Sequence, residues 1–286
     1  MLAVYIICFA ALLAAIYSYI ETILIKTVTY SVASAKIART FDNKRILLLS
    51  DLHCISFGKD NYRLYEAIEK ASPDIIVIAG DLINGNSKDF VYPRKLLEKL
   101  NSMGIPVYYS FGNHECKLAN AFHGEGEFER YTVLSEKYCT VLNNAHADID
   151  QNTVIYGLIL PLAQFDMKLK DGLLEPVEVF LGRPDKERYN IMIAHDPSYI
   201  REYLDWGADL VLSGHLHGGI VRLPLLGGLI SPRYTLFPKP DKGYYGYNGQ
   251  RAHVISAGLG WHAIPFRFMN RPELVVVELK SSDEQE

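Results

Sequence analysis

The chain has 286 residues, which is enough for one large domain or two small ones. Apolar residues make up 49% of it and charged residues 22%, a composition that excludes a disordered or low-complexity protein. Lysine and arginine number 29 against 33 acidic residues, so the net charge is −4 and there is no basic excess for binding a phosphate backbone. We therefore expect no nucleic-acid partner.

The N-terminus is apolar without interruption. Residues 1–20 carry no charged side chain, and they just reach the roughly 20 residues that a helix needs to cross the hydrocarbon core of a bilayer. A cleaved signal peptide would begin with basic residues, which are absent, and a buried core helix is rarely apolar on every face. We predict a transmembrane anchor over 1–20, a juxtamembrane linker over 21–42 and one catalytic domain over 43–286, with the lipid bilayer as a partner.

Basic residues indicate which side of the membrane the domain occupies. None precedes the apolar segment, whereas five follow it closely: Lys26, Lys36, Arg39, Lys44 and Arg45. The positive-inside rule then places the domain on the cytoplasmic face. Outside the apolar segment there remain three cysteines, an odd number that favours free thiols and agrees with this side.

The rest of the chain alternates strand-like and helical patterns. Short continuous apolar runs at 45–50, 74–79 and 107–111 predict strands covered on both faces. Apolar residues at helical spacing between these runs predict helices over 60–71 and around 96–100. Further strands are expected near 153–159, 190–194, 209–213, 253–257 and 273–279. This order predicts an α/β fold, a four-layer α/β/β/α sandwich of two mixed sheets. Residues 161–189 and 223–250 follow no clear pattern.

Polar residues follow five of these strands directly. The strand ends carry seven side chains of two chemical kinds, imidazoles and oxygen donors: Asp51, His53, Asp81, Asn113, His195, His215 and His217. Ligands gather outside the carboxyl ends of strands in open α/β sheets, so we expect one common site. The pairs Asp51/His53 and His215/His217 have the strand period, and their side chains point the same way if the extended geometry continues there.

The composition of this set indicates its chemistry. Mixed nitrogen and oxygen ligands suit Mn²⁺, Zn²⁺ or Fe, with Mn²⁺ the best match, whereas an all-oxygen set would suit Ca²⁺ or Mg²⁺. Seven ligands are too many for one tetrahedral ion and fit two. Two ions about 3.5–4 Å apart can clamp the attacking and leaving oxygens of a phosphoryl transfer.

The motifs Asp51-Leu-His53, Gly80-Asp81, Gly112-Asn-His-Glu115, His195 and Gly214-His-Leu-His217 resemble, in order, the five blocks of the calcineurin-like metallophosphoesterases. The end of the chain, from Gly258 to Glu273, looks like the membrane-anchored bacterial branch, which includes phosphodiesterases and the UDP-2,3-diacylglucosamine pyrophosphatases.

The resemblance implies a role for each residue. Asp51, His53 and His217 would hold the first metal, while Asn113, His195 and His215 would hold the second. Asp81 would bridge the two ions, and a metal-bound water or hydroxide between them would be the nucleophile. His114 would protonate the leaving oxygen, and Glu115 would orient His114.

Function is then expected to be hydrolysis of a phosphodiester or pyrophosphate, on a small-molecule, lipid-linked or nucleotide-linked substrate. A phosphomonoesterase of the same fold, or a member that only binds other proteins, remains an alternative. The sequence leaves the oligomeric state open.

Several further residues carry weaker expectations. Arg267 is a candidate phosphate contact, and Cys54 is expected to point into the core if the strand continues past His53. The apolar stretch 221–230 is either a strand pair that completes the core or a wall for acyl chains. Four histidines are assigned no ligand role: His123, His146, His253 and His262. His262, in a glycine-rich turn, could still support a ligand by contact with it.

Overall fold

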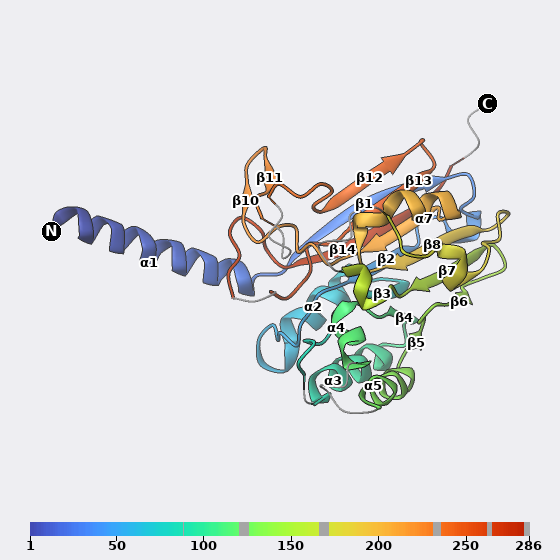
Figure 1. Cartoon of the computed structure of the whole chain (residues 1–286), viewed down its shortest axis with the longest axis horizontal. Coiled ribbons are helices and arrows are strands. Elements are labelled where there is room, and N and C mark those ends of the chain that lie inside the picture. The colour runs from blue at the N-terminus through green and yellow to red at the C-terminus, as the bar shows by residue number, and fades with distance from the viewer. Residues whose placement is uncertain (88, 120–125, 166–171, 231–235, 262–264, 283–286) are drawn as a thin grey trace.

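The computed structural model describes the whole chain except residues 88, 120–125, 166–171, 231–235, 262–264 and 283–286. A single long helix, α1 (Leu2–Ile23), extends away from an α/β body (Figure 1). It is long and apolar enough to cross a membrane.

The first sheet has six strands in mixed directions. In spatial order they are β1 (Lys26–Ser34), β14 (Glu273–Ser281), β2 (Arg45–Leu49), β3 (Ile75–Ala79), β4 (Val107–Ser110) and β5 (Thr140–Val141). Strands β2 to β5 run parallel, and β14 is antiparallel to β2. Three helices cover the outer face: α2 (Tyr62–Ala71), α3 (Val91–Ser102) and α5 (Glu127–Glu136).

The second sheet also has six strands. Their spatial order is β12 (Gly243–Tyr247), β13 (Arg251–Ile255), β9 (Leu210–Ser213), β8 (Tyr189–Ala194), β7 (Thr153–Leu158) and β6 (Ala145–Asp148). The four central strands are parallel and the two edge strands antiparallel. Helices α6 (Val177–Leu181) and α7 (Ile200–Trp206) pack on its outer face.

Side-chain alternation along the strands builds three apolar layers. In β2, Leu47 and Leu49 face the helices, whereas Ile46 and Leu48 face the second sheet. Because both faces of the central strands are buried, their sequences are continuously apolar, as the sequence analysis assumed. The predicted four-layer sandwich of two mixed sheets is confirmed.

The predicted linker over 21–42 needs correction. Residues 26–34 within it form β1, which pairs with β14 in parallel register from Lys26↔Glu273 to Ser34↔Ser281. The pattern Lys-Thr-Val-Thr-Tyr-Ser-Val alternates and is rich in β-branched residues, which suits a half-exposed edge strand. The body of the fold therefore begins well before residue 43.

Helix α1 joins the body without a flexible connection. Ser18, Glu21 and Thr22, at its C-terminal end, are buried, and Ser18 and Glu21 contact the segment 267–271. Glu21 accepts the backbone N–H of Asn270 at 3.0 Å and forms an ion pair with Arg271 at 2.9 Å. The direction of α1 is thus fixed relative to the sheets.

The two stretches without a clear sequence pattern contain little regular structure. Within the described part of 161–189, a 3-10 turn spans Leu162–Phe165 and α6 follows it. Within 223–250 lie β12 and one strand of a short hairpin, formed by β10 (Arg222–Leu223) and β11 (Gly227–Gly228). This hairpin stands close to the point where α1 leaves the body (Figure 1).

Candidate metal centre

The site lies where the carboxyl ends of both sheets meet. Asp51 and Asp81 follow β2 and β3 of the first sheet, whereas His195 and His215 follow β8 and β9 of the second. Several contacts join the sheets there; for example, His195 Nδ1 lies 2.6 Å from the carbonyl oxygen of Ala79, and His215 donates its backbone N–H to Asp51 at 3.0 Å. All seven predicted ligands are buried at this junction.

The backbone at these strand ends is not extended. Five of the predicted ligands have positive φ: Asp51 (52°), His53 (49°), Asp81 (56°), His215 (71°) and His217 (50°). The left-handed region disfavours residues with a Cβ, so such conformations persist where the surrounding structure imposes them, commonly at functional sites. The side chains of each pair still converge, but through left-handed turns and not through the strand alternation that we expected. Cys54 (φ 59°) is likewise outside any strand and only half-buried, with Sγ 3.9 Å from Ser87 Oγ.

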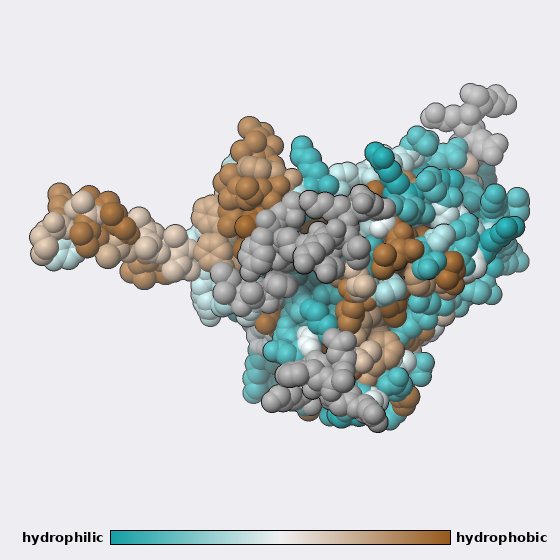
Figure 2. Space-filling model, in the orientation of Figure 1, coloured by the Kyte–Doolittle hydropathy of each residue, from teal (hydrophilic) through white to brown (hydrophobic). Residues whose placement is uncertain are grey.

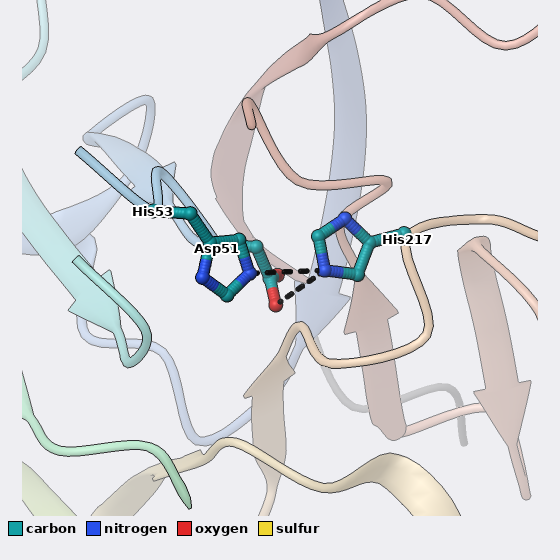
Figure 3. Close-up of side chains that lie close together, drawn as sticks. All are labelled: Asp51, His53 and His217. Atoms are coloured by element: carbon teal, nitrogen blue, oxygen red, sulfur yellow. Dashed lines mark hydrogen bonds and ion pairs between the residues drawn. The ribbon is translucent and has the colours of Figure 1, made fainter. Parts of the chain in front are cut away.

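The first ligand cluster consists of Asp51, His53 and His217 (Figure 3). His53 Nε2 lies 3.2 Å from His217 Nε2, and His217 Nε2 lies 3.5 Å from Asp51 Oδ1. Donor atoms that share one ion at about 2.1 Å lie roughly 3 Å apart, so these spacings suit a common ion. Ser50, which the sequence analysis did not single out, hydrogen-bonds the second oxygen of Asp51 through its hydroxyl.

The second cluster consists of Asp81, His195 and His215. His195 Nε2 lies 3.1 Å from Asp81 Oδ2 and 3.2 Å from His215 Nδ1. Asn113 belongs beside them by sequence, and its Oδ1 is buried with no hydrogen-bond donor among the described residues. An orphaned buried amide oxygen is costly unless a cation or water satisfies it, which fits a metal ligand.

Asp81 lies between the two clusters. Its Oδ1 accepts the backbone N–H of His114 at 2.9 Å, which leaves Oδ2 to face the histidines. Oδ2 is 3.1 Å from His195 Nε2 and 4.0 Å from His53 Nε2, so one oxygen approaches a ligand from each cluster. Burial opposes ionisation, but the imidazoles of His195, His114 and His53 outweigh it and hold the pKa of Asp81 well below its usual range.

Two glycines allow the close packing of this site. A Cβ on Gly112 would lie 2.3 Å from Asp81 Oδ1, and a Cβ on Gly214 would lie 2.4 Å from Asp51 Oδ2. Any larger residue would displace a predicted ligand carboxylate. The glycines in the Gly-Asn-His-Glu and Gly-His-Leu-His motifs are therefore required by space, and the residues present fit a pair of divalent ions.

His114 stands beside the ligands, on the short helix α4 (Asn113–Cys116). Its Nδ1 accepts the backbone N–H of Gly85 at 2.7 Å, so in the neutral ring the proton resides on Nε2. Nε2 lies 3.9 Å from Asp81 Oδ2. The ring thus presents a proton donor toward the place where both clusters meet.

Glu115 was expected to orient His114, but its carboxylate bonds other groups. Its carboxylate is fully buried and accepts the backbone N–H groups of Asp81 (2.8 Å), Gly112 (2.8 Å) and Ile83 (3.2 Å), and the Tyr109 hydroxyl at 2.9 Å. Burial and the nearby Asp81 carboxylate raise the pKa of Glu115 to about 7. Glu115 therefore positions the loops after β3 and β4, and the backbone of Gly85 orients His114 in its place.

Arg267 is not a phosphate contact in this structure. The side chain is only 2% exposed, and its guanidinium donates to the carbonyl oxygens of Asn270 (3.0 Å), Ala257 (3.0 Å) and Gly258 (3.1 Å). It fixes the turn at Gly258, where a Cβ would lie 2.7 Å from Asp51 Cβ. Its role is to support the wall behind Asp51.

The remaining histidines lie apart from the ligand clusters where they are described. His253 is buried in β13 with Nε2 2.9 Å from Ser213 Oγ, and His146 lies exposed on β6. His123 and His262 lie outside the described residues. All four cysteines are free, as expected.

An open cleft of about 560 Å³ adjoins His53 and His114. It is lined in addition by Asn84, Lys117 and Trp261, none of which the sequence analysis singled out. Asn84 Nδ2 donates to the backbone carbonyl of His53 at 3.0 Å. Lys117 follows His114 by three residues, a helical spacing that could have indicated its position on the same face.

A family model and the relatives of similar sequence all indicate the same protein family. The calcineurin-like phosphoesterase family model matches residues 44–219, which include every predicted ligand. The uncharacterized metallophosphoesterase YkuE of Bacillus subtilis is 26% identical over 278 residues, covering 93% of this chain and 89% of that protein. An uncharacterized metallophosphoesterase of Aquifex aeolicus is 28% identical over 280 residues, covering 95% and 98%.

Two vertebrate proteins are also similar. A transmembrane protein with metallophosphoesterase domain from Danio rerio is 26% identical over 268 residues, covering 90% of this chain and 58% of that protein. The crystal structure of a dimetal phosphatase from Danio rerio aligns with a TM-score of 0.41 at 12% identity, covering 83% of this chain and 99% of that one.

Proposed function

Because the chain belongs to the calcineurin-like phosphoesterase family, we propose that it is a dinuclear-metal hydrolase of phosphodiesters or pyrophosphates. The observation that carries the proposal is the position of His114, whose Nε2 proton faces both ligand clusters and the adjoining cleft. Asp51, His53 and His217 would hold one ion, Asn113, His195 and His215 the other, and Asp81 both. When bound, two such ions offset the charge of a phosphoryl group and acidify a water molecule.

The chain's own residues supply the remaining steps. In the neutral ring, whose Nδ1 accepts the Gly85 N–H, His114 donates an Nε2–H hydrogen bond to the leaving oxygen. Full proton transfer to that oxygen starts from the imidazolium, which carries a proton on each ring nitrogen and keeps the Nδ1 proton in place of the Gly85 hydrogen bond. Asp81 stays ionised, because three imidazoles surround its carboxylate. Glu115 holds Asp81 and Gly112 in place through their backbone N–H groups.

The cleft supports a substrate with a substituent on each side of the phosphorus. Every phosphoester needs room for its leaving group beside His114, and a cleft of about 560 Å³ also has room for the second substituent of a diester or the distal phosphate of a pyrophosphate. Lys117 would neutralise a second phosphate or an acidic group there, and Trp261 would supply an apolar face.

Mixed imidazole and oxygen ligands favour Mn²⁺, with Zn²⁺ and Fe as the alternatives. The test is hydrolysis by the purified full-length chain after chelation and addition of each ion in turn. We expect Mn²⁺ to restore the highest activity, with bis(p-nitrophenyl) phosphate cleaved faster than p-nitrophenyl phosphate. Exclusive cleavage of the monoester would show a phosphomonoesterase, and two bound ions without hydrolysis of either ester or a pyrophosphate would show a binding protein.

We also propose that α1 anchors the enzyme in a membrane, with a lipid-linked or nucleotide-linked substrate as the natural target. The apolar helix and the transmembrane protein from Danio rerio support the anchor. An anchored site meets membrane-borne substrates at a raised effective concentration. Retention of the full chain in membranes at alkaline pH tests the anchoring, and release into the supernatant would contradict it.

The cytoplasmic face is proposed from the basic residues after the helix. Part of that cluster serves the fold, because Lys36 pairs with Asp209 at 2.8 Å and Lys44 with Asp74 at 2.7 Å. Labelling of intact cells at an engineered cysteine near the C-terminus decides the side. An impermeant reagent should leave that cysteine unlabelled, and ready labelling would place the domain outside.

A further inference from the structure

The hairpin β10–β11 exposes an apolar surface that the proposed reaction does not use. At its tip, Leu225 is fully exposed and Leu226 is 59% exposed. Three neighbouring apolar side chains are also exposed: Leu236 (64%), Phe237 (46%) and Met269 (45%). These five residues are called here the hairpin patch. The hairpin β10–β11 lies in the apolar lobe beside the root of α1 (Figures 1 and 2). Residues 223–230 contain no charged side chain. An exposed apolar patch of this kind marks an interaction site.

The tip is not part of the core. A groove of about 830 Å³ lies against the hairpin, between its residues 223–227 and the segment 238–241, so the tip does not pack against the sheets. Among the described residues, the two strands form a ladder with each other and join neither six-stranded sheet. The tip residues 224–226 therefore lie outside the core, whereas the base of the hairpin is partly buried.

The conformation of Leu225 is itself unusual for a water-exposed turn. It has φ 67°, a left-handed geometry that turns normally assign to glycine, asparagine or aspartate. A leucine at this position is disfavoured twice, by its backbone and by its contact with water. The fold explains neither the positive φ of Leu225 nor its exposure. Both properties fit a tip that lies in an apolar environment.

The hairpin is linked to the anchor helix by an unbroken set of contacts. Tyr17 in α1 packs edge-on against Phe268, with ring centroids 5.2 Å apart. Phe268 forms an isolated parallel β-bridge with Val221 at the base of the hairpin, and the Phe268 carbonyl oxygen accepts the backbone N–H of Arg222 at 3.0 Å. Met269, next along the chain, lines the groove against the hairpin. The patch therefore lies at the end of the body from which α1 departs.

We propose that the hairpin patch inserts into the interfacial region of the bilayer and forms a second membrane contact beside α1. The proposal rests on the anchoring proposed above. The bilayer is the occupant because the patch continues the apolar surface of α1, and Lys239, exposed at the rim of the groove, suits the anionic headgroup layer.

This contact would set the height of the active site above the membrane. Asn270 donates its backbone N–H to Glu21 in α1 at 3.0 Å and its side-chain N–H to the carbonyl oxygen of His217 at 2.7 Å. The hairpin begins a few residues after His217 in the same frame. Anchor, hairpin and predicted metal ligands are thus joined through Asn270, so that membrane-borne substrates would meet the cleft in a defined orientation.

The test uses the full chain in phosphatidylcholine vesicles containing about one-fifth phosphatidylglycerol, with and without brominated acyl chains that quench tryptophan. Leu225→Trp places a reporter at the tip, and Val133→Trp, at a 56% exposed position on α5, is the matched control. The wild type gives the baseline of Trp206 and Trp261. We expect brominated lipid to quench the added Leu225→Trp emission at least threefold more than that of Val133→Trp.

Equal quenching of the two reporters would overturn the proposal. So would a blue-shifted Leu225→Trp emission that brominated lipid leaves unquenched, because it would place the tip against a second copy of the chain. Leu225→Asn should keep or raise the melting temperature in detergent, since asparagine tolerates positive φ; a clear fall would show a packed tip and also overturn the proposal. Alkaline extraction distinguishes failure of the hairpin contact from failure of the anchoring by α1. A chain that stays in the membrane with an unquenched tip refutes the hairpin contact alone. A chain that is released refutes both proposals.

Discussion

The Glu115 carboxylate accepts the backbone N–H of Asp81 at 2.8 Å, across 34 residues of sequence and from the neighbouring strand end. The carboxylate that we propose to bridge the two ions is thereby held in position through its backbone by a buried acceptor. We expect Glu115→Gln to weaken metal binding by roughly 10–100-fold, because an amide NH₂ cannot accept these N–H donors. Metal titration of the chelated protein measures the effect. The control is Tyr109→Phe, which removes only one hydroxyl donor to Glu115; full metal binding with lost turnover in Glu115→Gln would instead assign Glu115 to the chemistry.

Removal of single ligands should separate the two ions. We expect about two ions in the wild type, fewer than one in Asp81→Asn and about one in His217→Ala, since Asp81 faces both clusters and His217 only one. Elemental analysis of purified chains measures the content. The exposed His146→Ala controls for the loss of a histidine as such. One ion per chain in a fully active wild type would refute the bridged pair.

His114→Ala should leave the metal content intact and reduce turnover by roughly 10²–10⁴-fold, the usual contribution of general acid catalysis. The loss should be smaller for nitrophenyl esters, whose leaving groups need less protonation. Comparison of esters with leaving groups of rising pKa measures the trend. An equal loss for all of them would exclude His114 as the acid.

Arg267→Lys should lower the free energy of unfolding by about 3–5 kcal/mol, because an ammonium cannot reach the carbonyl oxygens that the buried guanidinium bonds. Denaturant unfolding in detergent measures it. Arg63→Lys, at an exposed position on α2, should change stability by less than about 0.5 kcal/mol. A raised KM with unchanged stability in Arg267→Lys would restore the phosphate-contact interpretation.

His253 should make the fold sensitive to mild acid. Burial lowers the pKa of His253 to about 3, against about 6.5 in the unfolded chain, so unfolding takes up a proton between these values. This term is absent above pH 6.5 and destabilises the fold progressively as the pH falls below it. His253→Gln should therefore show a shallower loss of stability between pH 7 and 5 than the wild type. Parallel curves for the two proteins would contradict this assignment.

The central strands, the two mixed sheets and the grouping of the seven predicted ligands at strand ends could all be predicted from the sequence. These features depend on local patterns: apolar runs define buried strands, and the carboxyl ends of parallel strands share one edge. The apolar N-terminal helix could also be predicted from the sequence, since its length and composition suffice to recognise it.

Tertiary structure alone decided what depends on distant partners. The alternating strand 26–34 became part of the fold only through pairing with β14, 247 residues later in the register Lys26↔Glu273. Arg267 has the same charge whether it binds phosphate or backbone carbonyls, and only its burial distinguishes them. Glu115 lies next to His114 in sequence, yet its acceptors face Asp81 and Gly112. Whether Leu225 is core or surface was settled by the groove beside it, because burial is a property of the neighbours that the folded chain supplies and not of the residue.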